Sequence, residues 1–127
     1  MKEMEYFNER LNSPILLAEG FYKGYKYYIL NLGSFPTAYV EVPRGHPDWF
    51  KDFDEVPILC NWGLTYGRNY LRGFNSGEWT IGWDYAHCTD YMGGDEDTRN
   101  LKKWTTREIF EEVKDVINQL IKRNKEL

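Results

Sequence analysis

The C-terminal segment of the chain constrains the fold more than any other stretch. Thr105-Thr106-Arg107-Glu108 has the pattern of a capping box, in which the Thr105 hydroxyl accepts a bond from the Glu108 N–H and the Glu108 carboxylate reaches back. Apolar residues then recur at helical spacing, at Ile109, Val113, Val116, Ile117, Leu120 and Ile121. We therefore expect an amphipathic helix over residues 105–125 that covers one face of a sheet.

Short β-rich segments separated by turn residues precede this helix. After an apolar run over 15–18, residues 19–32 predict a β-hairpin that turns at Lys23-Gly24, where glycine readily adopts φ > 0. Further strands are predicted over 38–42, 58–66 and 79–84, and the turn-rich residues 43–57 predict an ordered surface loop with one helical turn. The expected fold class is α+β, with a small, mostly antiparallel, twisted sheet of about five strands under the C-terminal helix.

The length of the chain fits one domain over residues 1–127, because a single core of this size needs no disulfides or metals. Residues 1–13 are expected to be an N-terminal extension or a short helix. No apolar run approaches the roughly 20 residues that span a bilayer, and the charged first residues are unlike a signal peptide. Cys60 and Cys88 form no metal-ligand pattern. We expect a cytoplasmic monomer or homodimer with no membrane contact, cofactor or metal.

The charge balance bears on the class of partner. There are 20 acidic residues against 16 basic ones, a net charge of −4, whereas a nucleic-acid binder needs a basic stripe. Aromatic residues make up 17% of the chain, and Tyr and Trp suit protein interfaces as well as cores. Direct nucleic-acid binding is therefore not expected, and the charge leaves other partners open.

Ionisable side chains gather where the last predicted strand ends. Asp84, His87 and Asp90 follow one another at intervals of three residues. Carboxylates and an imidazole can bind a divalent metal, with His46 as a fourth ligand, or can act as an acid/base pair. The alternative is structural, with Asp84 capping a turn and His87 bonding a backbone carbonyl. Both interpretations stay open at the level of the sequence.

Several short motifs resemble a family of small proteins encoded by bacteriophages and prophages, mostly of Gram-positive hosts. The family pattern has a strand with "GYV-V", an "HP" step, an "HGGLT" loop and a "WWIGFD-AH-GD" segment before a C-terminal helix. The segments of this chain that resemble it are Ala38 to Pro43, His46-Pro47, Gly63 to Tyr66, and Trp79 to His87.

The chain departs from the family pattern at three places. Asn61-Trp62 stands where the family has His-Gly, Trp83 replaces Phe, and Thr89 replaces the Gly before Asp90. The missing loop histidine weakens the case for a metal or catalytic site shared with the family.

The resemblance implies a phage accessory protein that inhibits a bacterial antiviral defence system by stoichiometric binding, with a CRISPR effector protein as the favoured target. The side chains expected to contact the partner are aromatic anchors and an acidic run opposite a basic surface. They are Trp49, Phe50, Trp62, Tyr66 and Tyr91, with Asp95, Glu96 and Asp97.

Two other functions are alternatives to inhibition by binding. The first is a small metal- or acid/base-dependent hydrolase that uses Asp84, His87, Asp90 and His46. The second is a sponge for a nucleotide immune signal, with bases stacked on Trp or Tyr.

Overall fold

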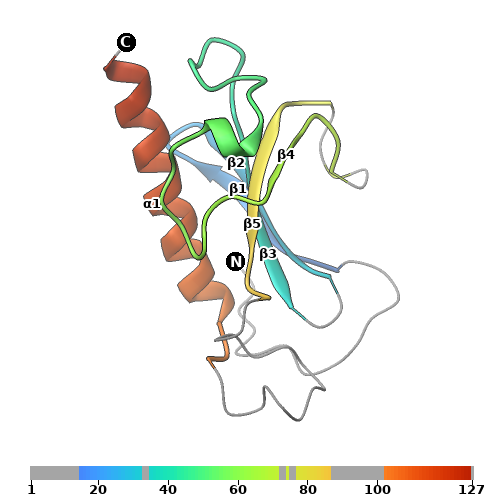
Figure 1. The fold of residues 1–127 in the computed structure, drawn as a ribbon. Helices are drawn as coiled ribbons and strands as arrows, with labels where there is room; N and C mark the ends of the chain where they lie inside the picture. The colour runs from blue at the N-terminus through green and yellow to red at the C-terminus, as the bar shows by residue number, and fades with distance from the viewer. Residues whose placement is uncertain (1–14, 33–34, 72–73, 75–76, 87–101, 127) are drawn as a thin grey trace.

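The computed structural model describes residues 15–32, 35–71, 74, 77–86 and 102–126 (Figure 1). Its elements, in chain order, are β1 (Ile15–Tyr22), β2 (Tyr25–Asn31), β3 (Pro36–Glu41), the 3₁₀ turn η1 (Phe53–Glu55), β4 (Tyr66–Arg68), β5 (Thr80–Asp84) and α1 (Thr106–Lys125). The strands form one sheet in the order β1-β2-β3-β5-β4, and every neighbouring pair is antiparallel. The α+β prediction is confirmed.

The β1–β2 hairpin turns where the sequence predicts it. Lys23 has φ 50° and Gly24 has φ 86°, and Tyr22 pairs with Tyr25 on either side of them. Positive φ at both central residues gives the turn the twist of the adjoining strands. This conformation explains the glycine in the turn.

Helix α1 begins with the predicted capping box. The Glu108 N–H donates to Thr105 Oγ1 at 3.1 Å, and the Thr105 N–H donates to Glu108 Oε1 at 3.0 Å. Five apolar side chains of the helix are completely buried: Ile109, Val113, Val116, Ile117 and Leu120. The helix lies along one face of the sheet, as Figure 1 shows, and its apolar face closes the main core there.

A second, smaller core lies on the other face of the sheet. Tyr28, Leu30 and Tyr39 pack there with Leu71, which follows β4 and is 1% exposed. Strand β2 is consequently buried on both faces over its last five residues. The sheet therefore has apolar cover on both sides near its centre.

The strand predicted over residues 58–66 is wrong for most of its length. Residues 58–65 form a loop with a turn closed by the Gly63 N–H on the Cys60 carbonyl at 2.9 Å, and β4 covers only three residues. The backbone groups of Leu59 bond to the Gln119 side chain instead of a neighbouring strand, so this apolar run packs against α1 rather than extending the sheet. The N-terminal segment predicted over 1–13 lies outside the described residues.

Gly82→Ala is expected to destabilise the protein by about 1–3 kcal/mol, because overpacking a tight site displaces its neighbours. Gly82 lies opposite Tyr39 in the β3–β5 ladder, and a Cβ atom there would meet a Tyr39 ring carbon at 2.7 Å and the Ala38 carbonyl oxygen at 2.9 Å. Urea unfolding measures the change. The control is Gly45→Ala, where a Cβ meets nothing within 4 Å and no loss of stability is expected. Equal stability of both variants with the parent would contradict the prediction.

Candidate functional site

Large apolar side chains are exposed along the segment between β3 and β5. Phe50 is 54% exposed and Trp62 is 59% exposed, as expected for partner-binding residues, whereas Trp49 and Tyr66 are only partly exposed. Three exposed neighbours in the same segment were not among the sequence candidates: Phe53, Leu59 and Tyr70. We call Phe50, Phe53, Leu59, Trp62 and Tyr70 the exposed apolar set.

Two members of this set stand on strained backbone. Phe50 has φ 65° and Trp62 has φ 59°, both in the left-handed region that side chains with a Cβ rarely adopt. Such strain costs on the order of 1–3 kcal/mol per residue and persists only where surrounding contacts impose it. The fold therefore holds two exposed aromatic side chains in place at an energetic cost.

The contacts that hold the Trp62 turn come from helix α1. Glu112 Oε2 accepts a hydrogen bond from the Asn61 N–H at 2.9 Å. The Gln119 side-chain amide bonds both backbone groups of Leu59: it accepts from the N–H at 2.8 Å and donates to the carbonyl oxygen at 2.7 Å. The loop that presents Trp62 is thus tied to the most regular element of the fold.

Phe50 is held by aromatic packing. Its ring stacks on Trp79 with a centroid distance of 4.8 Å and an interplanar angle of 16°, and Trp49 packs edge-on against it at 5.1 Å. The Arg44 guanidinium lies 5.5 Å from the Trp49 ring centroid. One ring face of Phe50 is therefore covered, while more than half of the residue remains exposed.

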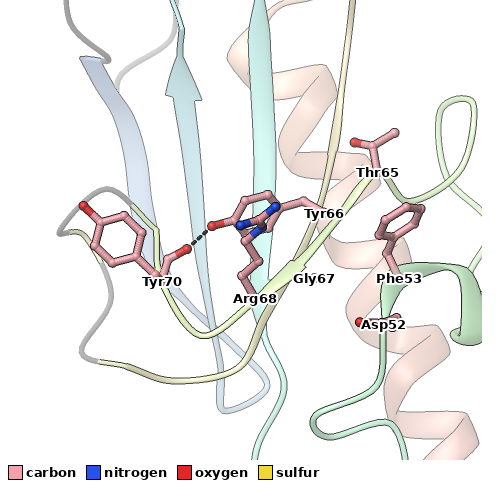
Figure 2. A pocket seen from close by; sticks show the side chains of 7 residues that line it. All are labelled: Asp52, Phe53, Thr65, Tyr66, Gly67, Arg68 and Tyr70. Atoms are coloured by element: carbon pink, nitrogen blue, oxygen red, sulfur yellow. Dashed lines mark hydrogen bonds between the residues drawn. The ribbon is translucent and has the colours of Figure 1, made fainter.

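A groove of about 690 Å³ runs beside β4 (Figure 2). Its lining residues are Asp52, Phe53, Thr65, Tyr66, Gly67, Arg68 and Tyr70. The Tyr66 hydroxyl donates to the Tyr70 carbonyl, and its ring packs edge-on against Tyr39 at 5.2 Å. Tyr66 therefore forms part of the groove wall, and its hydroxyl is engaged within the chain.

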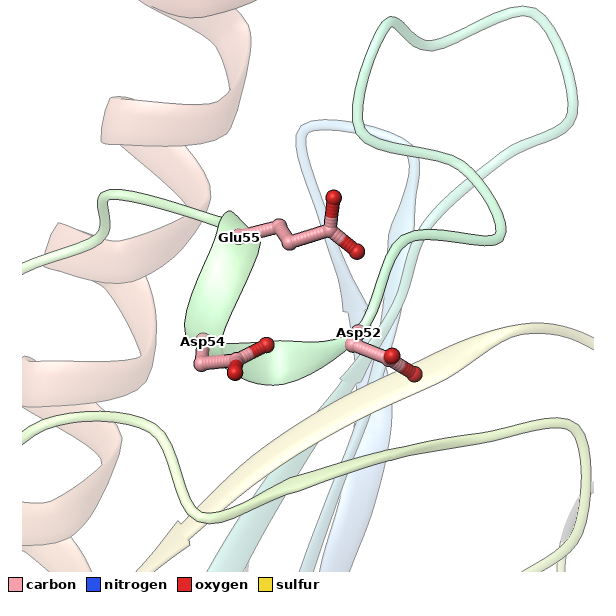
Figure 3. Close-up of side chains that lie close together, drawn as sticks. All are labelled: Asp52, Asp54 and Glu55. Carbon is pink, nitrogen blue, oxygen red and sulfur yellow. The ribbon is translucent and has the colours of Figure 1, made fainter.

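Three carboxylates gather around the η1 turn (Figure 3), and one of them, Asp52, also lines the groove. Asp52, Asp54 and Glu55 are exposed, and one carboxylate oxygen from each lies within 4.8 Å of the other two. Carboxylates are ligands for hard cations, but such sites use six or more oxygens, and exposed carboxylates are well solvated. We call these residues the acidic trio and interpret them as a negative patch beside the exposed apolar set.

His46 is buried and has both ring nitrogens engaged. Its Nδ1 accepts from the Asp48 N–H at 2.9 Å, which assigns the proton to Nε2, and Nε2 lies 2.7 Å from the Leu120 carbonyl oxygen. Neither nitrogen is available to a substrate or metal in this arrangement. The ring connects the loop after β3 to the last turns of α1.

Asp84 lies at the end of β5, away from His46. Its carboxylate accepts from the Thr65 hydroxyl and the Ala86 N–H, each at 3.2 Å. Asn61 joins the Asp84 carbonyl to Glu112, whereas His46 bonds Leu120, eight residues or about 12 Å further along the helix. The structure therefore does not bring these two sequence candidates together.

The remaining candidates lie outside the described residues: His87, Asp90, Tyr91, Asp95, Glu96 and Asp97. The acidic trio was missed by the sequence interpretation, although the alternation of charges and aromatics in Lys51-Asp52-Phe53-Asp54-Glu55 carried a signal for it. The sequence did not predict the contacts that Glu112 and Gln119 make with the loop. It indicated only that both residues fall on the polar side of the helix.

Comparison of the chain with protein-family models, curated proteins and solved structures found no match. In the part of the chain that the structure describes, no helix combines the length and the apolar composition needed to cross a bilayer.

Proposed function

We propose that the protein is a stoichiometric inhibitor of a bacterial antiviral defence system and acts by binding a defence protein, with a CRISPR nuclease as the favoured target. The observation that carries the binding mode is the pair of exposed aromatic residues, Phe50 and Trp62, on strained backbone. Strained, exposed aromatics cluster at binding sites, and aromatic anchors dominate interface energetics. The choice of target comes from the motifs that resemble small phage proteins.

The acidic trio adds a charge argument to this proposal. Asp52, Asp54 and Glu55 lie within the same segment as Phe50, Phe53 and Leu59. A negative patch beside apolar anchors complements a basic surface, such as a groove that normally holds nucleic acid, and accelerates association with it. The partner surface in this proposal is therefore basic and has apolar pockets.

Trp62→Gly tests the binding mode with little risk to the fold. Glycine adopts φ 59° without strain, so the variant is expected to fold at least as stably as the parent while losing the anchor. Inhibition of DNA cleavage by a purified CRISPR nuclease, titrated with the protein, is expected to weaken about 30-fold or more, a hot-spot effect of at least 2 kcal/mol.

The matched control is Phe21→Ala. Phe21 is 71% exposed on β1, at the edge of the sheet opposite to β4, and its loss is expected to leave inhibition unchanged. Full inhibition by Trp62→Gly, or equal losses in both variants, would refute this binding surface. A parent protein that inhibits no defence nuclease and protects no phage in a host with active defence would refute the function itself.

The acidic trio gives a separate kinetic prediction. The triple change Asp52→Asn, Asp54→Asn and Glu55→Gln is expected to slow association with the target about tenfold at low salt and to flatten the dependence of the rate on salt. Surface plasmon resonance at several ionic strengths measures both effects. An unchanged association rate and salt slope would exclude electrostatic steering by these residues.

The hydrolase alternative has less support. His46 uses both ring nitrogens within the chain, and Asp84 lies elsewhere, so the described residues assemble no acid/base pair from these two. The nucleotide alternative needs an enclosed pocket in which a base can stack on Trp or Tyr.

A further inference from the structure

Strand β4 forms one edge of the sheet. One of its sides pairs with β5, and no strand of the described residues lies along the other side. The groove of about 690 Å³ follows this free side, since all three residues of β4 line it (Figure 2). Its volume lies within the range of about 300–1,000 Å³ that is usual for binding clefts. The free edge of the sheet is therefore also a cleft.

The backbone of Gly67 faces this groove. The backbone groups of an antiparallel strand point to its two sides in alternation. On β5, the Gly82 carbonyl accepts from the Thr65 N–H at 2.9 Å, so the backbone groups of Gly82 face β4. Tyr66 pairs directly with Gly82, and the next residue, Gly67, therefore turns its N–H and C=O away from β5. Neither group has a hydrogen-bond partner among the described residues, so both are available to an added strand.

Opposite charges stand on the two walls of the groove. Gly67 pairs with Ile81, which belongs to the core under α1, so Gly67 faces the helix side of the sheet. A Cβ atom at Gly67 would meet the Phe53 nitrogen at 3.0 Å, which places the backbone of Phe53 on that same side. Figure 2 shows Asp52 and Phe53 on one side of β4 and Arg68 on the other. The helix-side wall therefore carries a negative charge, and the opposite wall carries a positive one.

Both charges are available to a ligand. Asp52 and Arg68 are exposed, and neither makes an ion pair or a side-chain hydrogen bond within the part of the chain that the structure describes. Phe53 and Tyr70 add exposed aromatic surface to the two walls. The groove thus combines a free backbone donor and acceptor with one charge of each sign and apolar contacts. This combination suits an extended peptide, which offers its own backbone groups and side chains that alternate between the two walls.

We infer that the free edge of β4 binds an extended segment of a partner protein as an added strand, with an acidic, a basic and an apolar residue in that order. The basic residue pairs with Gly67, accepting from its N–H and donating to its C=O, and its side chain points to Asp52. An antiparallel segment continues the arrangement of the sheet and sets the acidic residue opposite Arg68 and the apolar one opposite Tyr66. The inference rests on the proposed function for the identity of the partner.

A second copy of the chain suits this edge less well than such a segment. A two-fold axis at Gly67 would set one Gly67 against the other, so Asp52 would meet no basic side chain. It would also bring two acidic trios together on the helix side of the joined sheets. Like charges at close range disfavour pairing, whereas a basic residue at this position is attracted to the trio. The charge distribution therefore favours a segment of a different protein.

NMR titration of the ¹⁵N-labelled protein with a capped seven-residue peptide, Thr-Val-Glu-Lys-Leu-Val-Thr, tests the inference. The largest shift is expected at the Gly67 amide, since its N–H gains an acceptor. The control peptide exchanges Glu and Lys, which keeps the composition but sets each charge against a like charge. It is expected to bind at least about fivefold more weakly at low salt, because two exposed ion pairs are lost.

Methylation of one peptide nitrogen separates strand addition from contacts made by side chains alone. N-methylation of the central Lys removes the hydrogen that is donated to the Gly67 carbonyl and places a methyl group between the strands. Binding is expected to weaken about tenfold or more. N-methylation of the Glu before it is the matched control, because that N–H points away from β4, and a loss of less than about threefold is expected.

A double variant of the protein gives the reciprocal test. Asp52→Lys with Arg68→Glu is expected to reverse the preference, so that the peptide with Glu and Lys exchanged binds more tightly than the original. Both residues are exposed, so the melting temperature is expected to stay close to that of the parent.

Four outcomes would overturn the inference. They are no binding of the original peptide, equal affinities for the original and exchanged peptides, equal effects of the two methyl groups, and a dimer in sedimentation whose formation excludes the peptide. The proposed function fails separately, because these titrations use no defence protein. Selective peptide binding by a protein that inhibits no nuclease would remove the proposed function and keep the added strand. Inhibition without peptide selectivity would do the reverse.

Discussion

Asp48→Ala is expected to lower the free energy of unfolding by about 3 kcal/mol, because it leaves a guanidinium without its buried partner. Asp48 is completely buried, and Arg123 donates to its carboxylate through Nε at 2.5 Å and Nη2 at 2.7 Å. The Arg123 side chain is 27% exposed, so water compensates part of the loss and holds the effect at the lower end of the range for buried pairs. Urea unfolding of the two proteins measures the difference.

Asp52→Ala is the control for Asp48→Ala. Asp52 lies four residues further along the same loop but is exposed, and its removal is expected to change stability by less than about 0.5 kcal/mol. A loss below 1 kcal/mol in Asp48→Ala would show that the Arg123 pair contributes little to the connection between this loop and the helix.

The Asp48 carboxylate is also expected to make the stability of the protein depend on pH in the acidic range. Burial alone would raise the pKa of Asp48, but the hydrogen bonds and charge of Arg123, with the charge of Lys51 nearby, outweigh burial and hold the pKa below its ordinary value. A lowered pKa contributes stability above the unfolded value of about 3.9, and this stability is lost as the pH falls through the folded pKa. The stability gap between the parent and Asp48→Asn is therefore expected to be constant near neutral pH and to narrow below about pH 4.

The ion pair between Asp48 and Arg123 could not be predicted from the sequence, whereas the hairpin and α1 could. The hairpin and α1 depend on local chemistry, a turn with glycine at positive φ and a capping box before an apolar face, and both were predicted within a few residues. The contact of Asp48 with Arg123 joins residues 75 apart, and no local pattern specifies it. The strand predicted over 58–66 failed for the same reason, because the side chain of Gln119 competes for its backbone groups.

The candidate site was predictable in composition but not in conformation. The turn formers and aromatics of residues 43–57 predicted an ordered surface loop, and Phe50 and Trp62 are exposed as expected of anchors. Their left-handed backbone was not predictable, because local preference at Trp62 favours other conformations and only tertiary contacts impose φ 59°. Positions where local preference and tertiary structure disagree are those where function is expected.

Glu112 is the residue through which α1 holds both the Trp62 turn and the end of β5. It accepts hydrogen bonds from the Asn61 N–H at 2.9 Å, from Trp83 Nε1 at 3.1 Å and from the Tyr85 hydroxyl. Burial, followed by the Glu112 carboxylate, raises the pKa of Tyr85, so this hydroxyl stays protonated and remains a donor. Trp83 Nε1 also donates to the Tyr85 oxygen at 2.9 Å, which completes a small buried network.

Glu112→Ala is expected to cost about 3 kcal/mol, because it leaves the buried Tyr85 hydroxyl and the Asn61 N–H without their acceptor, at 1–3 kcal/mol each. Trp83 retains its bond to Tyr85, so it adds less. A double-mutant cycle with Tyr85→Phe checks the mechanism. In the Glu112→Ala background, Tyr85→Phe removes the orphaned donor but also the remaining acceptor of Trp83 Nε1, so its net effect is expected to be close to zero, whereas in the parent it costs about 1 kcal/mol. Hydrogen exchange at the Asn61 amide is expected to accelerate in Glu112→Ala and stay slow in Tyr85→Phe. Strictly additive losses, or an Asn61 amide that stays protected, would mean that the Trp62 turn is held by Gln119 and local packing instead.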